Sequence, residues 1–290
     1  MGEATITYPP VLASFLDAFD AASADDQRSL RNQLDLYLSL EADDRAELLK
    51  KHSLLASLIG AIGGVRVYEP AYRNALQPFS QYLLDRAGIS LSRGRIFELI
   101  YTQQLWGGGE SPSGSGSFLE ATFSLREALP KLFIRYHIRS MLDAPCGDFN
   151  WMKELGVGAL LESYHGVDIV PAMIALNQRR YAEPNLHFSV LDLVTTTPPK
   201  TDLILCRHLL MHLTLNDCLA VLNHFRESGA HYLLITSSPD AARNDEIVIT
   251  GAYRPLNVEI PPFNLGPRLE VVDDRQNPGD QTILALYSMQ

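Results

Sequence analysis

A short apolar segment followed directly by a tight turn constrains this chain more than any other feature. The pattern predicts a β-strand over residues 140–143, and the turn at 145–147 ends that strand. Gly147 can adopt a positive φ and lets a ligand lie against bare backbone. About twenty residues later, the apolar segment 164–169 predicts a second strand that carries Asp168 near its end. Because open parallel sheets bind ligands beyond the carboxyl ends of their strands, this pattern predicts a nucleotide-binding crevice.

The turn departs from the glycine pattern of dinucleotide-binding folds. Those folds use Gly-x-Gly-x-x-Gly to bring several backbone N–H groups to a pyrophosphate, whereas this turn contains only Gly147, followed by Asp148. Asp143 and Asp148 would repel a phosphate, but they could pair with an ammonium group. The residues therefore favour a ribonucleoside that carries a cationic amino-acid tail, and S-adenosylmethionine is such a molecule.

With these residues the chain resembles the class I S-adenosylmethionine-dependent methyltransferases. Their first motif places an acid at the end of strand one, then a glycine turn, then an acid at the end of strand two. The segment 187–193 resembles their third strand, and 202–208 resembles their fourth strand as it enters the catalytic loop. The resemblance covers about residues 100 to 290, and motifs in the correct order carry more weight than any one of them. It implies an α/β fold with a Rossmann-like seven-stranded sheet.

The segment 106–117 is rich in glycine and serine, which is typical of a flexible linker. It also resembles the Trp…Ser-x-Ser-Gly-x-Gly-Ser stretch that precedes the core in a bacterial subset of these methyltransferases, a subset with an Asp-x-x-Cys-Gly-Asp turn. By that resemblance, Ser113, Gly114 and Ser117 meet the methionine carboxylate. Trp106 then lies beside the cofactor.

The resemblance also orders the acids along the cofactor. Asp143 and Asp148 would hold the methionine end, while Asp168 would hold the ribose and Asp192 the adenine. The cofactor site implied in this way comprises Trp106, Ser113, Gly114, Ser117, Asp143, Ala144, Pro145, Cys146, Gly147, Asp148, Asp168, Ile169, Leu191, Asp192, Leu193 and Cys206.

The end of the fourth strand supplies the candidate catalytic residues Arg207, His208 and His212. A histidine titrates near neutrality, so either one could act as the general base for an O–H or N–H acceptor. The alternative for His212 is a hydrogen-bonded core residue. Two histidines four apart would share a helix face, but Leu209 stands where the metalloprotease pattern needs glutamate, so no metal site is expected.

Composition excludes several other classes of protein. The formal net charge is −10, and the sequence shows no excess of basic residues of the kind that nucleic-acid-binding proteins carry. Nucleic acid is therefore not an expected partner. No apolar run approaches the ~18 residues that span a bilayer, so no membrane association is expected. The first ten residues lack the features of a secretory signal, and the three cysteines form no Cys-x-x-Cys pair. We therefore expect a cytoplasmic protein with reduced thiols.

The first part of the chain has helical periodicity instead of alternating strands and helices. Apolar residues recur at helical spacing over 10–51, with expected helix starts at Ser23 and Glu41, and a further helix is expected over 78–87. We therefore expect a helical accessory module over residues 1–90 and a methyltransferase domain over 91–290. The module would either cap the crevice or form the interface of a homodimer.

These observations predict an enzyme that moves a methyl group from S-adenosylmethionine to oxygen or nitrogen of a small molecule, such as a secondary metabolite or a glycan. The irregular segment 244–263 could line the acceptor site. One alternative is a peptide-modifying methyltransferase, which would need a long groove. Another is a non-catalytic S-adenosylmethionine-binding scaffold protein, and a nicotinamide-dependent oxidoreductase is the most distant alternative.

Overall fold

The computed structural model describes residues 10–40, 42–64, 87–107, 109–247, 250–275 and 281–289. The chain divides into two compact units, Met1–Leu105 and Trp106–Gln290. This division falls after the boundary expected at residue 90, because α6 (Arg93–Thr102) associates with the first unit. Beside α6, the Gln103 side chain donates a hydrogen bond to the Tyr37 hydroxyl over 2.8 Å.

The first unit is helical, as its periodicity predicts. The Ser23 side chain caps the second helix by accepting the Asp26 N–H, at 3.1 Å. The helix expected over 78–87 lies outside the described residues. Besides α6, the helices in the described part of this unit are α1 (Pro10–Ala21), α2 (Ala24–Ser39), α3 (Ala42–Lys51) and α4 (Ser53–Gly64).

Helix α4 is the centre of the first unit, because α1, α2 and α3 all pack against it. Its sequence is apolar on more than one face, and Leu55, Leu58 and Ile62 are completely buried. A short helix with so little polar surface is stable only when neighbours cover it. Phe15 of α1 and Leu34 of α2, two of the helices that pack against α4, are also completely buried.

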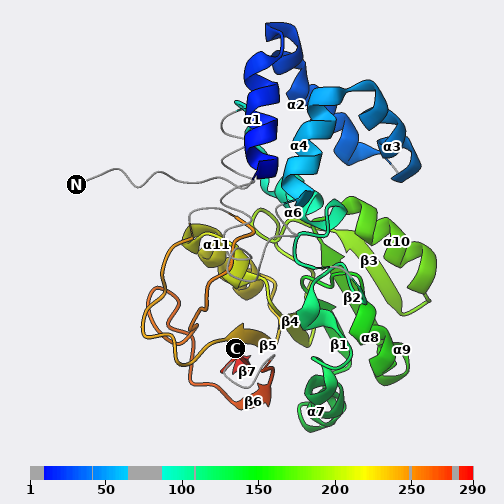
Figure 1. Cartoon of the computed structure of the whole chain (residues 1–290). Coiled ribbons are helices and arrows are strands. Elements are labelled where there is room, and N and C mark those ends of the chain that lie inside the picture. Colours follow the sequence, from blue (N-terminus) through cyan, green and yellow to red (C-terminus); the bar gives the residue numbers. More distant parts are fainter. Residues whose placement is uncertain are drawn as a thin grey trace. The chain divides into compact units, whose positions relative to one another are not determined.

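The second unit is built on a seven-stranded sheet with the order β3-β2-β1-β4-β5-β7-β6 (Figure 1). The first five strands in this order are parallel, and β7 runs antiparallel between β5 and β6. The fold class expected from the sequence is therefore confirmed. The strands are β1 (Ser140–Asp143), β2 (Ser163–Asp168), β3 (Leu186–Val190), β4 (Leu203–Cys206), β5 (Tyr232–Ser237), β6 (Glu270–Asp273) and β7 (Ile283–Ser288).

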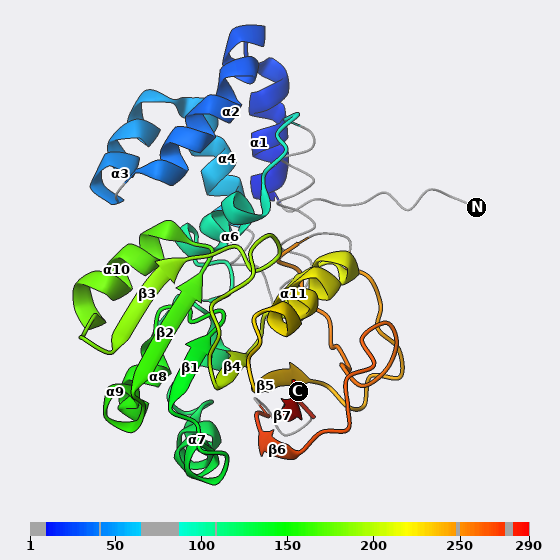
Figure 2. The ribbon, with the colours of Figure 1, turned by 180° about the vertical axis from the view of Figure 1, so that it is seen from behind.

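The central parallel strands β1 and β4 are short and buried, as strands covered on both faces must be. All four residues of β4 are buried, and so are the last three of β1. Helices connect and cover the strands: α10 packs on β2 and β3, α7 packs on β6, and α11 lies toward the β5 side of the sheet (Figures 1 and 2). These helices are α7 (Phe123–Arg135), α8 (Asn150–Leu155), α9 (Val157–Leu160), α10 (Pro171–Tyr181) and α11 (Leu215–Glu227).

The strand register places the acids of the sequence motifs at one edge of the sheet. Asp143 ends β1 beside Gly166, Asp168 ends β2 beside Val190, and Asp192 follows β3 by two residues. The strand order reverses between β1 and β4, and such a switch point opens a crevice at the carboxyl ends of the strands.

The residues between β5 and β6 form an ordered but irregular segment wherever they are described. The Asn244 side chain organises it by donating to the Asn257 and Pro261 carbonyls, both at 2.9 Å, and by accepting the Asn257 N–H at 2.8 Å. β6 and β7 form an antiparallel hairpin near the end of the chain. Among the described residues, no helix is both long enough and apolar enough to cross a bilayer.

Candidate active site

The turn after β1 requires glycine at position 147. Gly147 has a φ of +55°, and a Cβ there would lie 2.6 Å from the Ser113 side-chain oxygen. Phe149 also adopts a left-handed conformation, with a φ of 61°, and it caps α8. Tight turn and close contact together explain why this position carries no side chain.

The glycine- and serine-rich segment that precedes α7 folds onto this turn. Ser111 and Ser113 donate hydrogen bonds to Asp148 Oδ1 over 2.9 and 3.0 Å, and Ser113 Oγ accepts the Asp148 N–H over 3.0 Å. The Asn150 side chain donates to the Ser117 carbonyl over 3.0 Å. A flexible linker would make no such contacts, so this segment is a packed part of the second unit.

Asp168 joins the ends of β1 and β2. Its carboxylate accepts the Gly147 N–H at 3.3 Å and the Val170 N–H at 3.1 Å. Burial raises the pKa of Asp168 to about 6, against the opposing effect of these backbone hydrogen bonds. Asp192 is half-buried at the end of the next strand and accepts the Val194 N–H at 3.0 Å.

Asp143 lies deeper than the other acids. It is 3% exposed and accepts a hydrogen bond from the Tyr164 hydroxyl at 2.7 Å. Burial raises the pKa of Asp143 to about 7, although the Tyr164 hydrogen bond and the charge of Arg207 act in the opposite direction. The Asp143 carboxyl is therefore engaged with the protein core beside the turn.

The raised pKa of Asp143 predicts how stability depends on pH. Between about pH 4 and pH 7 the native carboxyl keeps a proton that the unfolded chain has released, so this group stabilises the fold less as pH rises. Asp143→Asn should flatten this decline, by ~1.4 kcal/mol per unit of pKa difference. Urea unfolding followed by tryptophan fluorescence measures it, since Trp106 and Trp151, the chain's two tryptophans, both lie in the second unit. Equal pH slopes in the two proteins would contradict the expectation.

The apolar and thiol members of the predicted cofactor site line the ends of the strands. The thiols of Cys146 and Cys206 are buried, and burial raises the pKa of each well above its ordinary value. Cys146 packs where a side chain at Gly166 would stand, 3.0 Å from its Cβ position, so it acts as a small packing residue. Ala144 and Leu193 are buried, whereas Pro145, Ile169 and Leu191 are half-buried.

Arg207, predicted as a catalytic residue, is held in a buried ion pair. Its Nε and Nη2 atoms donate to both oxygens of Asp274, over 2.7 to 3.1 Å, and Nη2 also donates to the Gly116 carbonyl over 2.8 Å. The guanidinium lies over the Trp151 ring, 5.6 Å from its centroid. Arg207 therefore ties the serine-rich segment and the C-terminal hairpin to the end of β4.

His208 shares the same carboxylate. Its Nε2 lies 3.1 Å from Asp274 Oδ2, and its backbone N–H donates to Thr236 Oγ1 over 2.9 Å. His208 has a φ of +54°, and the helical turn that contains His212, the three-residue η4 (Leu210–His212), begins after His208. The expectation that His208 and His212 share a helix face is therefore wrong, because the chain leaves β4 in a left-handed conformation.

His212 is fixed by a different set of contacts. Its Nδ1 lies 2.8 Å from the Ala252 carbonyl, and its ring stacks on Trp106 with centroids 4.4 Å apart. The Trp106 indole N–H donates to the Gly251 carbonyl over 3.3 Å. Burial lowers the pKa of His212 to about 4, so it is neutral at physiological pH. Because a carbonyl only accepts, the proton lies on Nδ1 and Nε2 keeps its lone pair.

Sequence reasoning missed two members of this site, Asp274 and Ser111. Asp274 lies in the segment after β6 and reaches Arg207 only through sheet assembly, so no local motif marks it. One signal was available: an arginine directly after a fully apolar strand needs a buried acid as its partner. Ser111 is completely buried beside Asp148, although it belongs to a segment with the composition of a linker.

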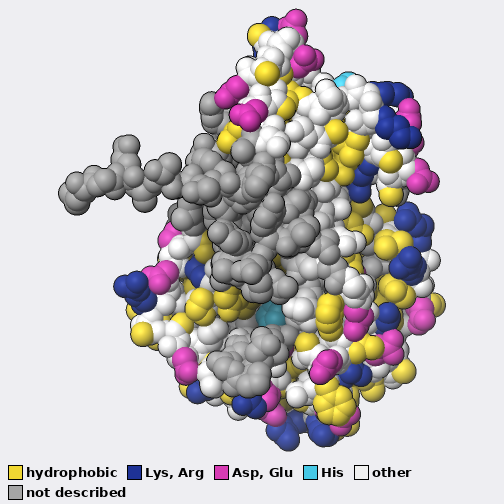
Figure 3. Space-filling view, in the orientation of Figure 1, with side chains coloured by type: hydrophobic (Ala, Val, Ile, Leu, Met, Phe, Trp, Pro, Cys, Tyr) yellow, Lys and Arg dark blue, Asp and Glu magenta, His cyan; other side chains and the backbone are white. Residues whose placement is uncertain are grey.

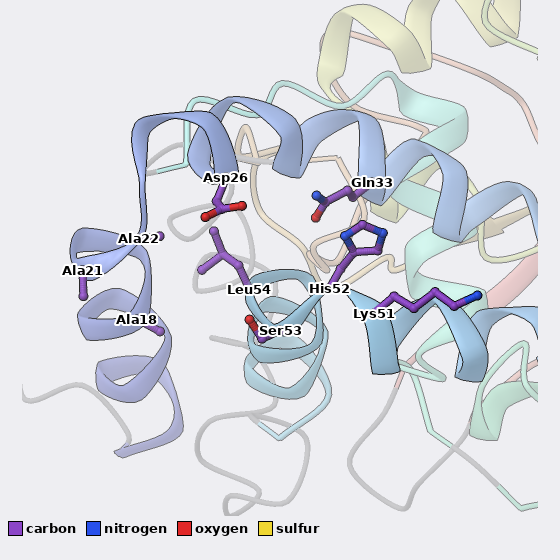
Figure 4. Close-up of a pocket in the computed structure, with 9 residues that line it drawn as sticks. All are labelled: Ala18, Ala21, Ala22, Asp26, Gln33, Lys51, His52, Ser53 and Leu54. Carbon is purple, nitrogen blue, oxygen red and sulfur yellow. The ribbon is translucent and has the colours of Figure 1, made fainter.

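The first unit contains a pocket of its own, with a volume of about 320 Å³ (Figure 4). It lies among α1, α2 and the start of α4 and contains none of the predicted site residues. Polar and apolar side chains are mixed in its lining, which consists of Ala18, Ala21, Ala22, Asp26, Gln33, Lys51, His52, Ser53 and Leu54.

The sheet order gives the second unit the Rossmann-like seven-stranded fold of methyltransferases. Residues 141–228 match the family model described as "Methyltransferase domain". This stretch runs from β1 to the end of α11 and includes the turn, the three strand-end acids and both histidines. The match and the sheet topology agree over this part of the chain.

Solved structures similar to the chain include three methyltransferases. One is magnesium protoporphyrin IX methyltransferase (ChlM) from Synechocystis PCC 6803 with bound SAM, at 15% identity over 69% of this chain and 98% of that one, with a TM-score of 0.47. Another is the N-methyltransferase NodS from Bradyrhizobium japonicum WM9, at 15% identity over 57% and 96%, with a TM-score of 0.39. The third is the methyltransferase domain of bacterial CtHen1-CN, at 13% identity over 58% and 99%, with a TM-score of 0.44. Structural similarity at these identities and TM-scores does not identify the substrate. No curated protein matches the sequence.

Proposed function

We propose that the protein transfers a methyl group from S-adenosylmethionine to an oxygen or nitrogen atom of a small molecule. The observation that carries the proposal is a pair of carboxylates, Asp148 in the turn after β1 and Asp168 at the end of β2. Asp148 hydrogen-bonds serine hydroxyls and Asp168 hydrogen-bonds backbone N–H groups, so only neutral donors contact them among the described residues. Their charge is left for a ligand that is cationic and rich in hydroxyl groups.

These carboxylate acceptors suit S-adenosylmethionine better than a dinucleotide. Asp148 would face the ammonium group, Asp168 the ribose hydroxyls and Asp192 the adenine. A pyrophosphate would instead be repelled by the same carboxylates. When bound, S-adenosylmethionine supplies an activated methyl group, and the protein then contributes mainly alignment and removal of a proton.

Two histidines are candidates for the proton acceptor, and the geometry favours His208. Burial lowers the pKa of His212 to about 4, which makes it a weak base, and its ring is held between Trp106 and the Ala252 carbonyl. His208 has a carboxylate partner in Asp274, which stabilises the protonated ring. Its side chain is 23% exposed, so an acceptor can approach it.

Isothermal titration tests cofactor binding directly. We expect S-adenosylmethionine and S-adenosylhomocysteine to bind, and NAD to show no heat of binding under the same conditions. Binding of NAD in their place would overturn the proposal and support an oxidoreductase. Tight binding of S-adenosylmethionine with no turnover on any acceptor would support the scaffold alternative.

The histidine variants test the chemistry. With a panel of hydroxyl and amine acceptors, we expect His208→Gln to lower the rate of S-adenosylhomocysteine formation by about 100- to 10,000-fold without changing cofactor affinity. His212→Gln should lower the rate less, because its main contacts position Trp106 and the 251–253 segment. The reverse ranking would assign the base to His212. Turnover on peptides alone would support the peptide-modifying alternative.

Surface charge agrees with a small acceptor. On the face shown in Figure 3, Lys and Arg side chains are interspersed with Asp and Glu side chains over the second unit. Tyr253, which is 51% exposed, lies 6.2 Å from the His212 ring between centroids and offers an aromatic surface. We propose that this surface contributes to acceptor binding. The first unit would either cover the acceptor or mediate a homodimer, and sedimentation velocity with and without cofactor distinguishes these roles.

A further inference from the structure

A single buried carboxylate connects two side chains at the end of β4. Asp274 is 1% exposed, and it contacts both Arg207 and His208, which are neighbours in the chain. Burial alone would raise the pKa of Asp274, but the charges of Arg207 and of protonated His208, together with hydrogen bonds from both partners, hold it below its ordinary value. Asp274 is therefore ionised at neutral pH.

The hydrogen-bond inventory of this cluster determines where the proton of His208 lies. An ionised carboxylate only accepts hydrogen bonds and a guanidinium only donates them. Asp274 Oδ1 accepts from Arg207 Nη2 over 2.7 Å, and Oδ2 lies 3.1 Å from His208 Nε2. The neutral imidazole of His208 must therefore carry its proton on Nε2, which leaves the lone pair on Nδ1.

The backbone holds the imidazole in this arrangement. His208 adopts a φ of +54°, a conformation that costs a non-glycine residue free energy and persists only where its surroundings impose it. Here the imposing contacts are the hydrogen bond from the His208 N–H to Thr236 and the side-chain contact with Asp274. Both contacts come from other strands or strand ends, so the ring is oriented by tertiary structure.

We propose that Asp274 is a positioning residue that orients His208 so that Nδ1 accepts the proton of the methyl acceptor. This proposal rests on the proposed function and adds a residue that no sequence motif marks. In an O-methylation, the oxygen lone pair forms the new bond to carbon and the bonding pair of the methyl–sulfur bond stays on sulfur. The proton of the hydroxyl passes to Nδ1, and the resulting imidazolium is stabilised by the Asp274 carboxylate. Arg207 in turn fixes Asp274.

The tautomer of His208 provides a test that needs neither cofactor nor acceptor. In protein labelled with ¹⁵N-histidine, long-range ¹H–¹⁵N spectra distinguish the Nδ1–H and Nε2–H tautomers of each of the eight histidines. Spectra of His208→Gln and His212→Gln assign the two rings of interest. We expect wild-type His208 to be the Nε2–H tautomer when neutral.

His212 is the internal reference in the same spectra. Its Nδ1 faces the Ala252 carbonyl, so it should be the Nδ1–H tautomer, opposite to His208. The expected result is therefore two neighbouring histidines with opposite tautomers in one protein, which a general effect of solvent or pH would not produce.

The variant Asp274→Asn should reverse the tautomer of His208 alone. Because Arg207 can only donate, it will bind the single amide oxygen of asparagine, and the amide NH₂ will then face His208. Nε2 must then accept, so the proton moves to Nδ1. His212 should stay unchanged, and so should both rings in Asp273→Asn, which alters the exposed neighbour of Asp274.

Either of two results would overturn the proposal: a neutral wild-type His208 in the Nδ1–H form, or an unchanged His208 tautomer in folded Asp274→Asn. The wild-type spectrum decides the first point even when the variant does not fold. Failure of the proposed function appears separately, as absence of S-adenosylmethionine binding in the titration, and would leave the tautomers as expected.

Discussion

Replacing Asp168 by asparagine is expected to weaken the binding of S-adenosylmethionine by about 100-fold. The proposed contact to the ribose consists of two hydrogen bonds to a charged acceptor, and each such bond contributes ~1.5–3 kcal/mol. An amide offers one acceptor in place of two and no charge. In addition, Asp168 accepts the Gly147 and Val170 N–H groups, so its loss also loosens the turn on which the cofactor would lie. Isothermal titration measures the change.

Asp202→Asn is the matched control for this prediction. Asp202 also accepts two backbone N–H groups, those of Arg139 and Ser140, both at 2.9 Å, but these lie at the start of β1 instead of its end. The control should lose a similar amount of stability and keep its affinity for the cofactor. Equal losses of affinity in the two variants would show that Asp168 acts only through the fold, and unchanged affinity in Asp168→Asn would remove it from the site.

Asp274→Ala is expected to destabilise the second unit by about 3–5 kcal/mol. Removing one partner from a buried pair leaves the other charge without compensation, and Arg207 is only 6% exposed. The Gly116 carbonyl alone cannot balance the guanidinium. Urea unfolding followed by tryptophan fluorescence is suited to this measurement, because Trp151 lies under Arg207 and both tryptophans report on the second unit.

The adjacent residue supplies the control for this second prediction. Asp273 pairs with Arg275 over 2.6 Å, but both side chains are about half exposed, at 43% and 55%. Exposed pairs contribute ~0–1 kcal/mol, so Asp273→Ala should change stability by no more than that. A loss in Asp274→Ala no larger than the loss in Asp273→Ala would show that water reaches Arg207 and that the pair is not buried in solution.

Local patterns were enough to predict the strands and the acids of the second unit. The turn around Gly147 and the acids Asp168 and Asp192 all follow from apolar segments and the residues that end them. Each of these signals depends on residues within a few positions of one another. A strand buried on both faces is recognisable in the sequence because it is a short, nearly continuous apolar run. The fold class could therefore be derived before any contact was known.

The same local patterns could not predict contacts between segments that are distant in the chain. Composition alone favours a linker over 106–117, whereas the fold packs Ser111 and Ser113 against Asp148. Helical spacing suggested that His208 and His212 share a face, whereas the positive φ of His208 separates them. Side-chain composition does not encode which surface a segment meets, because that surface exists only after the sheet has assembled.

By itself the sequence determined the kind of sheet and the edge at which its acids gather, since strand ends and turn residues are set by local sterics and by burial of apolar side chains. Only the tertiary structure decided that Arg207 and His208 share Asp274, and that Trp106 stacks on His212. These partners are tens of residues apart in the chain. They meet because the parallel strands and the C-terminal hairpin pair into one sheet, and the free energy that holds them comes from burial of that sheet as a whole.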